Sequence, residues 1–381
     1  MLRQNLLFFM KKIWKKLPAK ARLWILTVRS ATCLYPRPTP TCANRIAILA
    51  AFRSCNGLAQ GAKFYADRIE REGRIVIRVD ITKIMMQHPV LPLEKTGAIS
   101  LNEFMAMKLQ CVLVIHANPP QFHLVLFKMG RRFLLDKKII AYWAWELEVI
   151  PDVWLHALQY LDAIEVPSTF VRNALLPYTD KDIVVVPHSL GSPSRHKTAF
   201  AYDGIVRCLF IFDMGSTFVR KNPMAALEAF RLAFKPGEAR MTFKVSSPQA
   251  DCENLKKLEQ ACAQVPGVSI ITRTLEDSAL EELYLKHDVY LSLHRSEGYG
   301  LTIHEALLYG LYAVATGWSG NMDYMDMPKA FAVPYKLVPL QETNGAFKGL
   351  KALWAEADVK AAADILRGLR LEILAKNMPD A

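Results

Sequence analysis

The sequence predicts an α/β protein with two doubly wound, Rossmann-like domains. Apolar runs of strand length alternate with amphipathic stretches of helical length along most of the chain, as in parallel sheets that carry helices on both faces. A polar stretch rich in turn residues interrupts this alternation once, at His188 to Gly204. The chain has 381 residues, 52% of them hydrophobic and 22% charged, which suffices for two globular domains with separate cores.

Residues 1–43 are the first expected segment, a basic arm followed by a linker. The formal net charge of the protein is +12, and nine of these charges come from residues 1–40, which contain no Asp or Glu. The other 341 residues therefore carry a net charge of only +3. A nucleic-acid binder would carry its positive charge on the folded body, so we expect no nucleic-acid partner.

The arm has the pattern of an amphipathic helix. Leu6, Met10, Ile13 and Leu17 recur at helical spacing, and four lysines lie on the opposite side. Its apolar runs are shorter than the roughly 20 residues that span a bilayer. We expect residues 1–30 to lie on an anionic membrane surface, which makes the protein cytoplasmic and peripheral on the inner face of the cell membrane. The alternatives are a disordered extension and a helix packed on the protein itself.

The first domain is expected over residues 44–190. It opens with an apolar strand, a turn containing Gly57, an amphipathic helix to about Glu72 and a second strand, which together make a βαβ unit. Residues 191–204 are the expected linker to the second domain. Further strands of the first domain are predicted from apolar runs at 111–116, 138–143, 162–166 and 182–186.

The second domain, expected over residues 205–381, repeats the alternation. We also expect the stretch from Ala352 to Ala375 to be helical. Strands are predicted at 206–212, 241–245, 268–272 and 289–293, and helices at 223–234, 252–263, 278–286 and 301–309.

Two glutamates bracket the turn between the last of these strands and its helix. Glu297 is expected on the loop at the carboxyl end of the strand, and Glu305 on the second turn of the helix. Gly298 and Gly300 between them allow a tight turn, and the first amides of the helix face an anion such as a diphosphate. The carboxylates would then accept hydrogen bonds from hydroxyls of a sugar and a ribose. The alternative is a glutamate that only caps the helix.

A basic pair precedes another predicted helix. Arg220 and Lys221 stand before Asn222 and Pro223, which have the chemistry of an N-cap and a first helical residue. Arginine binds two phosphate oxygens at once and lysine adds a compact charge, so the pair suits a nucleotide diphosphate. A solvated basic turn is the alternative.

The sequence indicates no metal and no resident cofactor. The Asp323 to Asp326 spacing does not fit a metal-binding DxD motif, and the seven scattered cysteines form no CxxC pair and no Cys/His cluster with metal-ligand spacing. This cysteine usage indicates a reducing compartment.

Several segments together resemble one enzyme family. The stretch from His294 to Asp323 resembles the E-x7-E signature of retaining GT-B glycosyltransferases of the family 4 type (glycosyl transferases group 1), and the RKNP motif resembles the basic pair that holds the donor diphosphate in that group. Three further segments, NGLAQGAKFYADRIEREG, AYWAWELEVIPDVW and VPSTFVRNAL, resemble parts of its first domain, so the likeness covers nearly the whole chain past residue 45. It implies a GT-B fold, in which an acceptor-side domain and a nucleotide-sugar-binding domain face a central cleft.

The resemblance also implies roles for individual residues. Glu305 is expected to hold the ribose and Glu297 the transferred sugar. His116 has a structural alternative at a strand end, and Glu146 lies in a tryptophan-rich segment that suits a core equally well. The expected catalytic residues are Glu297, Arg220, Lys221 and His116, the donor-binding residues are Gly57, Gly298, Tyr299, Gly300, Leu301 and Glu305, and the acceptor-binding residue is Glu146.

These expectations lead to one function and one alternative. The function is a metal-independent, retaining hexosyltransferase that takes a nucleotide sugar as donor and a glycan, in particular a lipid-linked intermediate of surface polysaccharide biosynthesis, as acceptor. The alternative is a nucleotide-sugar epimerase, because epimerases use a similar two-domain fold.

Overall fold

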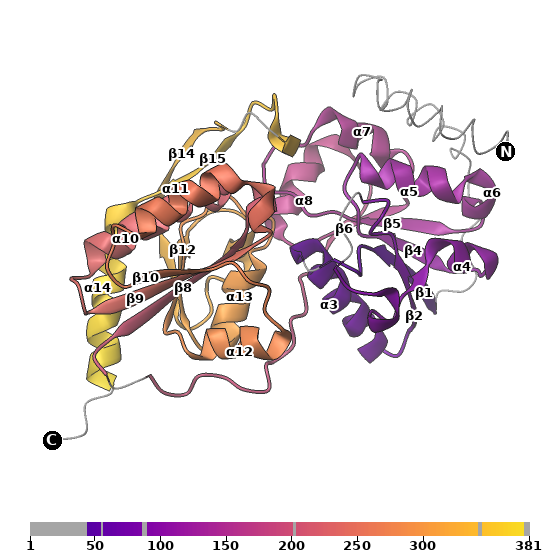
Figure 1. The fold of residues 1–381 in the computed structure, drawn as a ribbon. Helices are drawn as coiled ribbons and strands as arrows, with labels where there is room; N and C mark the ends of the chain where they lie inside the picture. The colour runs from indigo at the N-terminus through magenta and orange to yellow at the C-terminus, as the bar shows by residue number, and fades with distance from the viewer. Residues whose placement is uncertain (1–43, 55, 86–89, 201–202, 342–344, 377–381) are drawn as a thin grey trace. The chain divides into compact units, whose positions relative to one another are not determined.

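The computed structural model describes residues 44–54, 56–85, 90–200, 203–341 and 345–376 (Figure 1). The basic arm expected over residues 1–43 lies outside the described residues. The chain divides into two compact units. Of the described residues, the first contains those up to Ala144 together with Ile150–Val166 and Leu175–Ser189, and the second contains Trp145–Val149, Pro167–Ala174 and those from Leu190 onward.

The first unit is built around a seven-stranded sheet in which all neighbouring strands are parallel, in the order β3-β2-β1-β4-β5-β6-β7. Its strands are β1 (Arg45–Ala50), β2 (Ile75–Asp80), β3 (Ile99–Ser100), β4 (Val112–Ile115), β5 (Lys138–Tyr142), β6 (Ala163–Val166) and β7 (Ile183–Val185). The helices of this unit are α3 (Gly57–Arg71), α4 (Leu101–Ala106), α5 (Gln121–Met129), α6 (Arg131–Leu134) and α7 (Asp152–Leu158). The helix α8 (Thr169–Leu175) follows β6 in the chain, but all of it except Leu175 belongs to the second unit.

The second unit contains a six-stranded parallel sheet in the order β10-β9-β8-β11-β12-β13. Within this unit α10, α11 and α14 cover one face of the sheet, and α12 and α13 cover the other (Figure 1). The strands are β8 (Val206–Asp213), β9 (Ala239–Ser246), β10 (Val268–Ile271), β11 (Val289–Ser292), β12 (Tyr312–Thr316) and β13 (Ala330–Val333). The helices are α9 (Phe218–Lys221), α10 (Pro223–Ala233), α11 (Cys252–Cys262), α12 (Asp277–Leu285), α13 (Leu301–Leu308) and α14 (Val359–Lys376).

The expected fold class is confirmed, because both units are doubly wound parallel α/β structures. That the two units face a central cleft remains an expectation from the resemblance.

One part of the expected secondary structure is wrong. The sequence predicts helices around Ala352 to Ala375, but the first part of this stretch is the strand β15 (Leu353–Ala357), which pairs antiparallel with β14 (Tyr335–Pro339). Leu, Ala and Glu favour helices locally, and pairing with a strand about 20 residues earlier in the chain overrides that preference here. The helix, α14, starts only at Val359.

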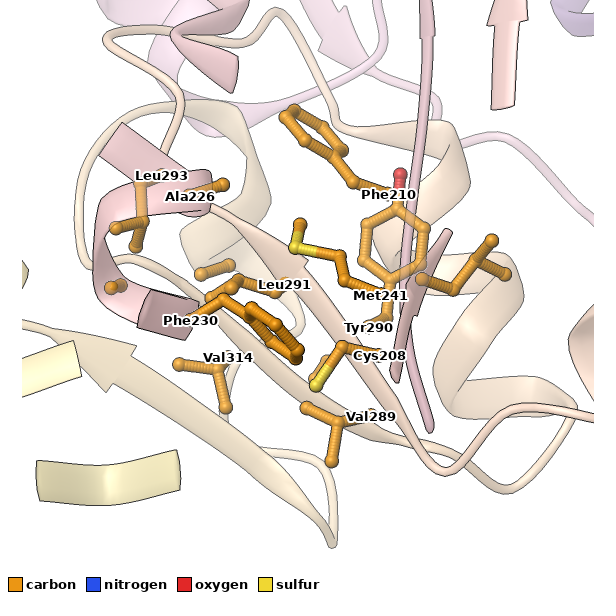
Figure 2. Close-up of a cluster of buried hydrophobic side chains, with 14 of the residues drawn as sticks. Cys208, Phe210, Ala226, Phe230, Met241, Val289, Tyr290, Leu291, Leu293 and Val314 are labelled. Carbon is orange, nitrogen blue, oxygen red and sulfur yellow. The ribbon is translucent and has the colours of Figure 1, made fainter. Parts of the chain in front are cut away.

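The apolar side chains of the second sheet form one buried core. Phe210 of β8, Met241 of β9, Leu291 of β11 and Phe230 of α10 lie in it, each at most 3% exposed (Figure 2). Burying a side chain of this size stabilises the fold by about 1.5–3 kcal/mol. The loops that follow β8 and β11 are therefore anchored to well-packed strands.

In each sheet the strand order reverses at one place, between β1 and β4 in the first and between β8 and β11 in the second. Doubly wound sheets bind ligands at the carboxyl ends of the strands beside such a reversal. In the second unit these ends carry the loops with Arg220, Lys221 and Glu297.

Candidate functional site

Two loops of the second unit are bonded to each other where the strand order reverses. The loop after β8 leads into α9 and α10, and the loop after β11 leads into α13. The amide of Arg295 donates to the carbonyl of Arg220 at 2.8 Å, and Nη1 of Arg220 donates to the carbonyl of Ser296 at 2.8 Å. These bonds fix the positions of the basic pair and of Glu297 relative to each other.

Arg220, Lys221 and Glu297 form a charge cluster in which Arg220 and Glu297 are buried and Lys221 is partly buried. Nζ of Lys221 lies 2.5 Å from Oε1 of Glu297, and Nη1 of Arg220 lies 3.3 Å from Oε2. Nη2 of Arg220 also lies 3.7 Å from Oε1 of Glu146, which belongs to the second unit. The structure thus brings together four of the expected site residues.

The cluster keeps Glu297 ionised. Burial alone would raise the pKa of Glu297, but attraction to Lys221 and then to Arg220 outweighs it and lowers the pKa to about 2. At Glu146 the effect of burial is larger than the attraction to Arg220, so the pKa of Glu146 is raised. Glu297 is therefore a fixed negative charge at neutral pH.

Three buried polar atoms in these two loops have no hydrogen-bond partner among the described residues. They are Oγ1 of Thr217, Nε of Arg220 and Oγ of Ser296. Leaving a buried polar group unpaired costs about 1–3 kcal/mol, and such groups are rare unless a ligand or water pairs with them. An oxyanion is a suitable partner for all three, since each carries a hydrogen to donate. Sequence reasoning missed Thr217 and Ser296, because isolated hydroxyl residues give no pattern.

Asn222 takes the expected N-cap position of α10, but its side chain does not cap the helix. It stands before Pro223 at the start of α10, but its backbone is left-handed at φ 51°, and its side chain makes no capping bond. Its amide Nδ2 instead donates to the carbonyl of Leu293 at 3.0 Å. The expected capping role is therefore wrong, because the side chain bonds the end of β11 and adds another tie between the two loops.

The glycines of the loop after β11 are required by close packing within the protein. A Cβ on Gly298 would lie 3.0 Å from the carbonyl oxygen of Trp145, and one on Gly300, at φ +85°, would lie 2.6 Å from the hydroxyl of Tyr324. Gly320, which sequence reasoning did not single out, supports the same turn, since its Cβ would lie 2.2 Å from the carbonyl oxygen of Gly298. Donor contact by Gly298 and Gly300 remains a prediction.

The side chains of Tyr299 and Leu301 have partners within the unit. Tyr299 is 5% exposed and its hydroxyl lies 2.8 Å from Nδ1 of His304. Leu301 is the first residue of α13 and packs against the core. Donor contact by Tyr299 and Leu301 remains a prediction.

Glu305 lies on the second turn of α13, as expected, in surroundings unlike those of Glu297. Its Oε2 accepts a hydrogen bond of 2.7 Å from the hydroxyl of Tyr284, and no cation pairs with it among the described residues. Burial raises the pKa of Glu305 to about 7, although the bond from Tyr284 lowers it. This carboxylate changes its charge near neutral pH.

The remaining two expected residues lie in the first unit, beside its own strand reversal. His116 follows β4 directly and is 4% exposed, and its ring stacks on Tyr142 at 4.3 Å. Burial, and to a smaller extent His188, lower the pKa of His116 to about 3, so the ring is neutral at pH 7. Its Nε2 has no hydrogen-bond partner among the described residues. Gly57 is the first residue of α3, after the N-cap Asn56.

The described residues contain no group of three or more His, Cys, Asp or Glu side chains that could hold a metal ion. No helix in this part of the chain is long and apolar enough to cross a membrane. Independence of a metal and binding to a membrane surface both remain predictions.

No family model matches the sequence, and no curated protein matches it either. The fold is similar to solved glycosyltransferase structures. HepE from Anabaena in complex with UDP and glucose has a TM-score of 0.60 at 12% identity, over 87% of this chain and 92% of its own. A glycosyltransferase from Rickettsia africae has a TM-score of 0.55 at 15% identity, over 88% and 97%. A variant of TarM from S. aureus, in complex with UDP among other ligands, has a TM-score of 0.51 at 12% identity, over 70% of this chain and 50% of its own. At these identities the likeness shows the fold.

Proposed function

We propose that this protein is a retaining, metal-independent glycosyltransferase that transfers a hexose from a nucleoside-diphosphate sugar to a glycan acceptor. The observation that carries the proposal is the cluster of Arg220, Lys221 and Glu297 in two loops beside the strand reversal of the second sheet. The fold shared with HepE and TarM, both solved with UDP, makes UDP-sugars the first donors to test.

Arg220 and Lys221 bind the donor diphosphate in this proposal. Arg220 is buried and Lys221 is partly buried, and Arg220 has a buried Nε that no described residue bonds. Hydrogen bonds from charged donors to phosphate oxygens are roughly twice as strong as neutral ones. The amides at the start of α13 add further donors, since the first amides of a helix have no acceptor within it.

The two glutamates bind hydroxyl groups at opposite ends of the diphosphate. Glu297 accepts from the transferred sugar, because its pKa of about 2 keeps it a hydrogen-bond acceptor at any physiological pH. Glu305 accepts from the ribose of the nucleotide. His116, neutral and with a free Nε2, contacts the sugar or the acceptor, while Gly57 contacts the donor phosphates and Glu146 the acceptor.

The chemistry needs no protein nucleophile. The bond between the anomeric carbon and the diphosphate oxygen breaks, and the acceptor oxygen bonds to that carbon on the same face. The proton of the acceptor hydroxyl moves to the departing phosphate oxygen. Charge develops on the leaving diphosphate, so the contribution of Arg220 and Lys221 is to stabilise that charge, in the place that a metal ion takes in other transferases.

We further propose that the acceptor is a lipid-linked glycan of surface polysaccharide biosynthesis, and that residues 1–30 hold the enzyme on the anionic inner face of the cell membrane. The support is the amphipathic pattern of the sequence and its lysines. Flotation with anionic and neutral liposomes tests this part. The full chain should float with anionic vesicles and a chain starting near Ala43 should not, whereas equal flotation of both would remove the membrane anchor.

A donor screen tests the enzymatic proposal. The purified full chain is incubated with UDP-, GDP- and ADP-sugars, with and without a lipid-linked glycan fraction, and both donor consumption and product are followed. We expect release of the nucleoside diphosphate from one donor class, accelerated by the acceptor and unaffected by EDTA. Conversion of the donor into another nucleotide sugar without any acceptor would instead identify an epimerase. Turnover that EDTA abolishes would remove the metal-independent mechanism.

A further inference from the structure

Tyr284 supplies the hydrogen bond that Glu305 receives within the protein. It lies in the last turn of α12, is 1% exposed, and its hydroxyl donates to Oε2 of Glu305 on α13 at 2.7 Å. Among the described residues no other side chain or backbone group donates to this carboxylate. The second oxygen, Oε1, is therefore available to a ligand.

The ring of Tyr284 is held in place by stacking. It stacks on Tyr309 with the ring centroids 4.8 Å apart and the planes at 11°, and it lies 6.4 Å from the ring of Tyr290. Burial, and then the charge of Glu305, keep the pKa of Tyr284 well above its ordinary value, so its hydroxyl remains protonated and can donate. A fixed ring with one polar atom at its end sets the direction of the bond to Glu305.

We propose that Tyr284 is a positioning residue for the donor, because its hydroxyl holds one oxygen of Glu305 so that the other accepts a hydrogen bond from a ribose hydroxyl of the nucleotide. This inference rests on the proposed function. It identifies the ribose, rather than the sugar or the phosphates, as the part of the donor that Tyr284 controls, and it was not visible in the sequence.

The bond also sets the pH range in which Glu305 works. The titratable groups that face Glu305 are Tyr284 of α12, Tyr290 of β11, Tyr309 at the end of α13 and Tyr324 after β12, all neutral, and no cation pairs with it among the described residues. A hydrogen bond to the charged form lowers a pKa, so loss of the Tyr284 hydroxyl raises that of Glu305 further. Glu305 then loses its charge at a higher pH.

The test compares Tyr284→Phe with Tyr309→Phe. Both changes remove one hydroxyl from the same ring stack and keep the ring, but only Tyr284 bonds Glu305. The affinities for UDP, 2′-deoxy-UDP and 3′-deoxy-UDP are measured by titration calorimetry of the full chain between pH 6 and pH 9. The ratio of the UDP affinity to that of a deoxy analogue reports the ribose contact, since ionisation of the phosphates affects both nucleotides alike.

We expect the wild type to prefer UDP over at least one deoxy analogue, and this preference to fall as the pH drops below about 7. Tyr284→Phe should reduce the preference about tenfold, the effect of one hydrogen bond at a charged group, and shift its midpoint to higher pH. Tyr309→Phe should match the wild type.

The inference would be overturned if Tyr284→Phe showed the same preference for UDP over the deoxy analogues as Tyr309→Phe, with the same pH midpoint. This result would leave the nucleotide-binding proposal intact. A wild type that binds UDP without any preference between about pH 6 and 9 would also overturn the inference, and this measurement needs no variant, so it decides the matter even if Tyr284→Phe fails to fold. A wild type that binds none of UDP, GDP and ADP would instead remove the proposed function.

Discussion

Glu297 and Glu305 are eight residues apart in the sequence and identical in chemistry, yet the structure surrounds them differently. Glu297 lies against Lys221 and Arg220, and its pKa falls to about 2. Within the described part of the chain, Glu305 pairs only with the neutral hydroxyl of Tyr284, and burial raises its pKa to about 7. A motif gives the spacing of two acids, whereas their charges depend on neighbours that come from other elements of the fold.

The difference has a simple electrostatic cause. Two opposite charges 4 Å apart attract by about 4 kcal/mol when the effective dielectric constant is about 20. The attraction of two cations at this distance is larger than the effect of burial on the pKa of Glu297. The hydrogen bond from one neutral donor is too weak to offset the effect of burial on the pKa of Glu305. We therefore expect Glu297 to be a permanent charge and Glu305 a group whose charge responds to pH.

The largest expected effect comes from removing the cation of Lys221. Lys221→Ala should lower transfer at least about 100-fold, because the departing diphosphate loses a charged partner. Glu305→Ala should lower transfer as well, through loss of the ribose contact. Both rates are measured with saturating acceptor, and circular dichroism checks that each variant is folded. Wild-type turnover by either folded variant would refute its assigned role.

The second expected effect is a loss of unfolding free energy at acidic pH, caused by protonation of Glu297. The folded pKa of Glu297, about 2, lies below the ordinary value of 4.5, so its pairing stabilises the protein above pH 4.5 and is lost as the pH falls toward 2. The shift corresponds to about 3 kcal/mol of unfolding free energy. Urea unfolding of the wild type and of Glu297→Gln between pH 3 and pH 6 measures it. If the unfolding free energies of the two proteins changed in parallel with pH, the pairing of Glu297 with its cations would be contradicted.

The contribution of Glu305 to the unfolding free energy should depend on pH in the opposite direction. Its folded pKa, about 7, lies above 4.5, so the folded state holds the proton more tightly and the unfolding free energy falls as the pH rises from 4.5 to 7. Glu305→Gln should therefore be more stable than the wild type above pH 7, by up to about 3 kcal/mol. Urea unfolding at pH 5 and pH 8 checks this, and a variant that is equally or less stable at pH 8 would show that burial does not raise this pKa.

The smallest effect is expected from a substitution in the β14–β15 hairpin, which is linked through Arg295 to the residue before the basic pair. Arg295 donates to the carbonyl of Val219 and to Oε2 of Glu356 on β15 at 2.8 Å. Glu356→Gln should lower the unfolding free energy by about 0.5–1 kcal/mol, since the pair is partly exposed, and weaken UDP binding slightly. A change in UDP binding as large as that of Lys221→Ala would mean that Glu356 belongs to the site itself.

The sequence was informative about features that depend on local pattern. The alternation of apolar runs and amphipathic stretches predicted both sheets, and strand-to-helix turns placed Glu297 and Glu305 on their elements. Prediction from the sequence failed where the structure of a segment depends on a partner far away in the chain. The strand β15 has a helix-forming composition and is a strand because β14 pairs with it. Asn222 bonds Leu293 instead of capping, and nothing in the sequence connects Tyr284 with Glu305.

The measurement that tests the account most directly is the binding of nucleoside diphosphates, UDP first, to the full chain and to Lys221→Met by titration calorimetry at pH 8. The account predicts that the wild type binds one of UDP, GDP and ADP, and that loss of the Lys221 charge weakens this binding at least about tenfold. A wild type that binds none of the three, or a folded Lys221→Met that binds as well as the wild type, would contradict a donor site built on this charge cluster.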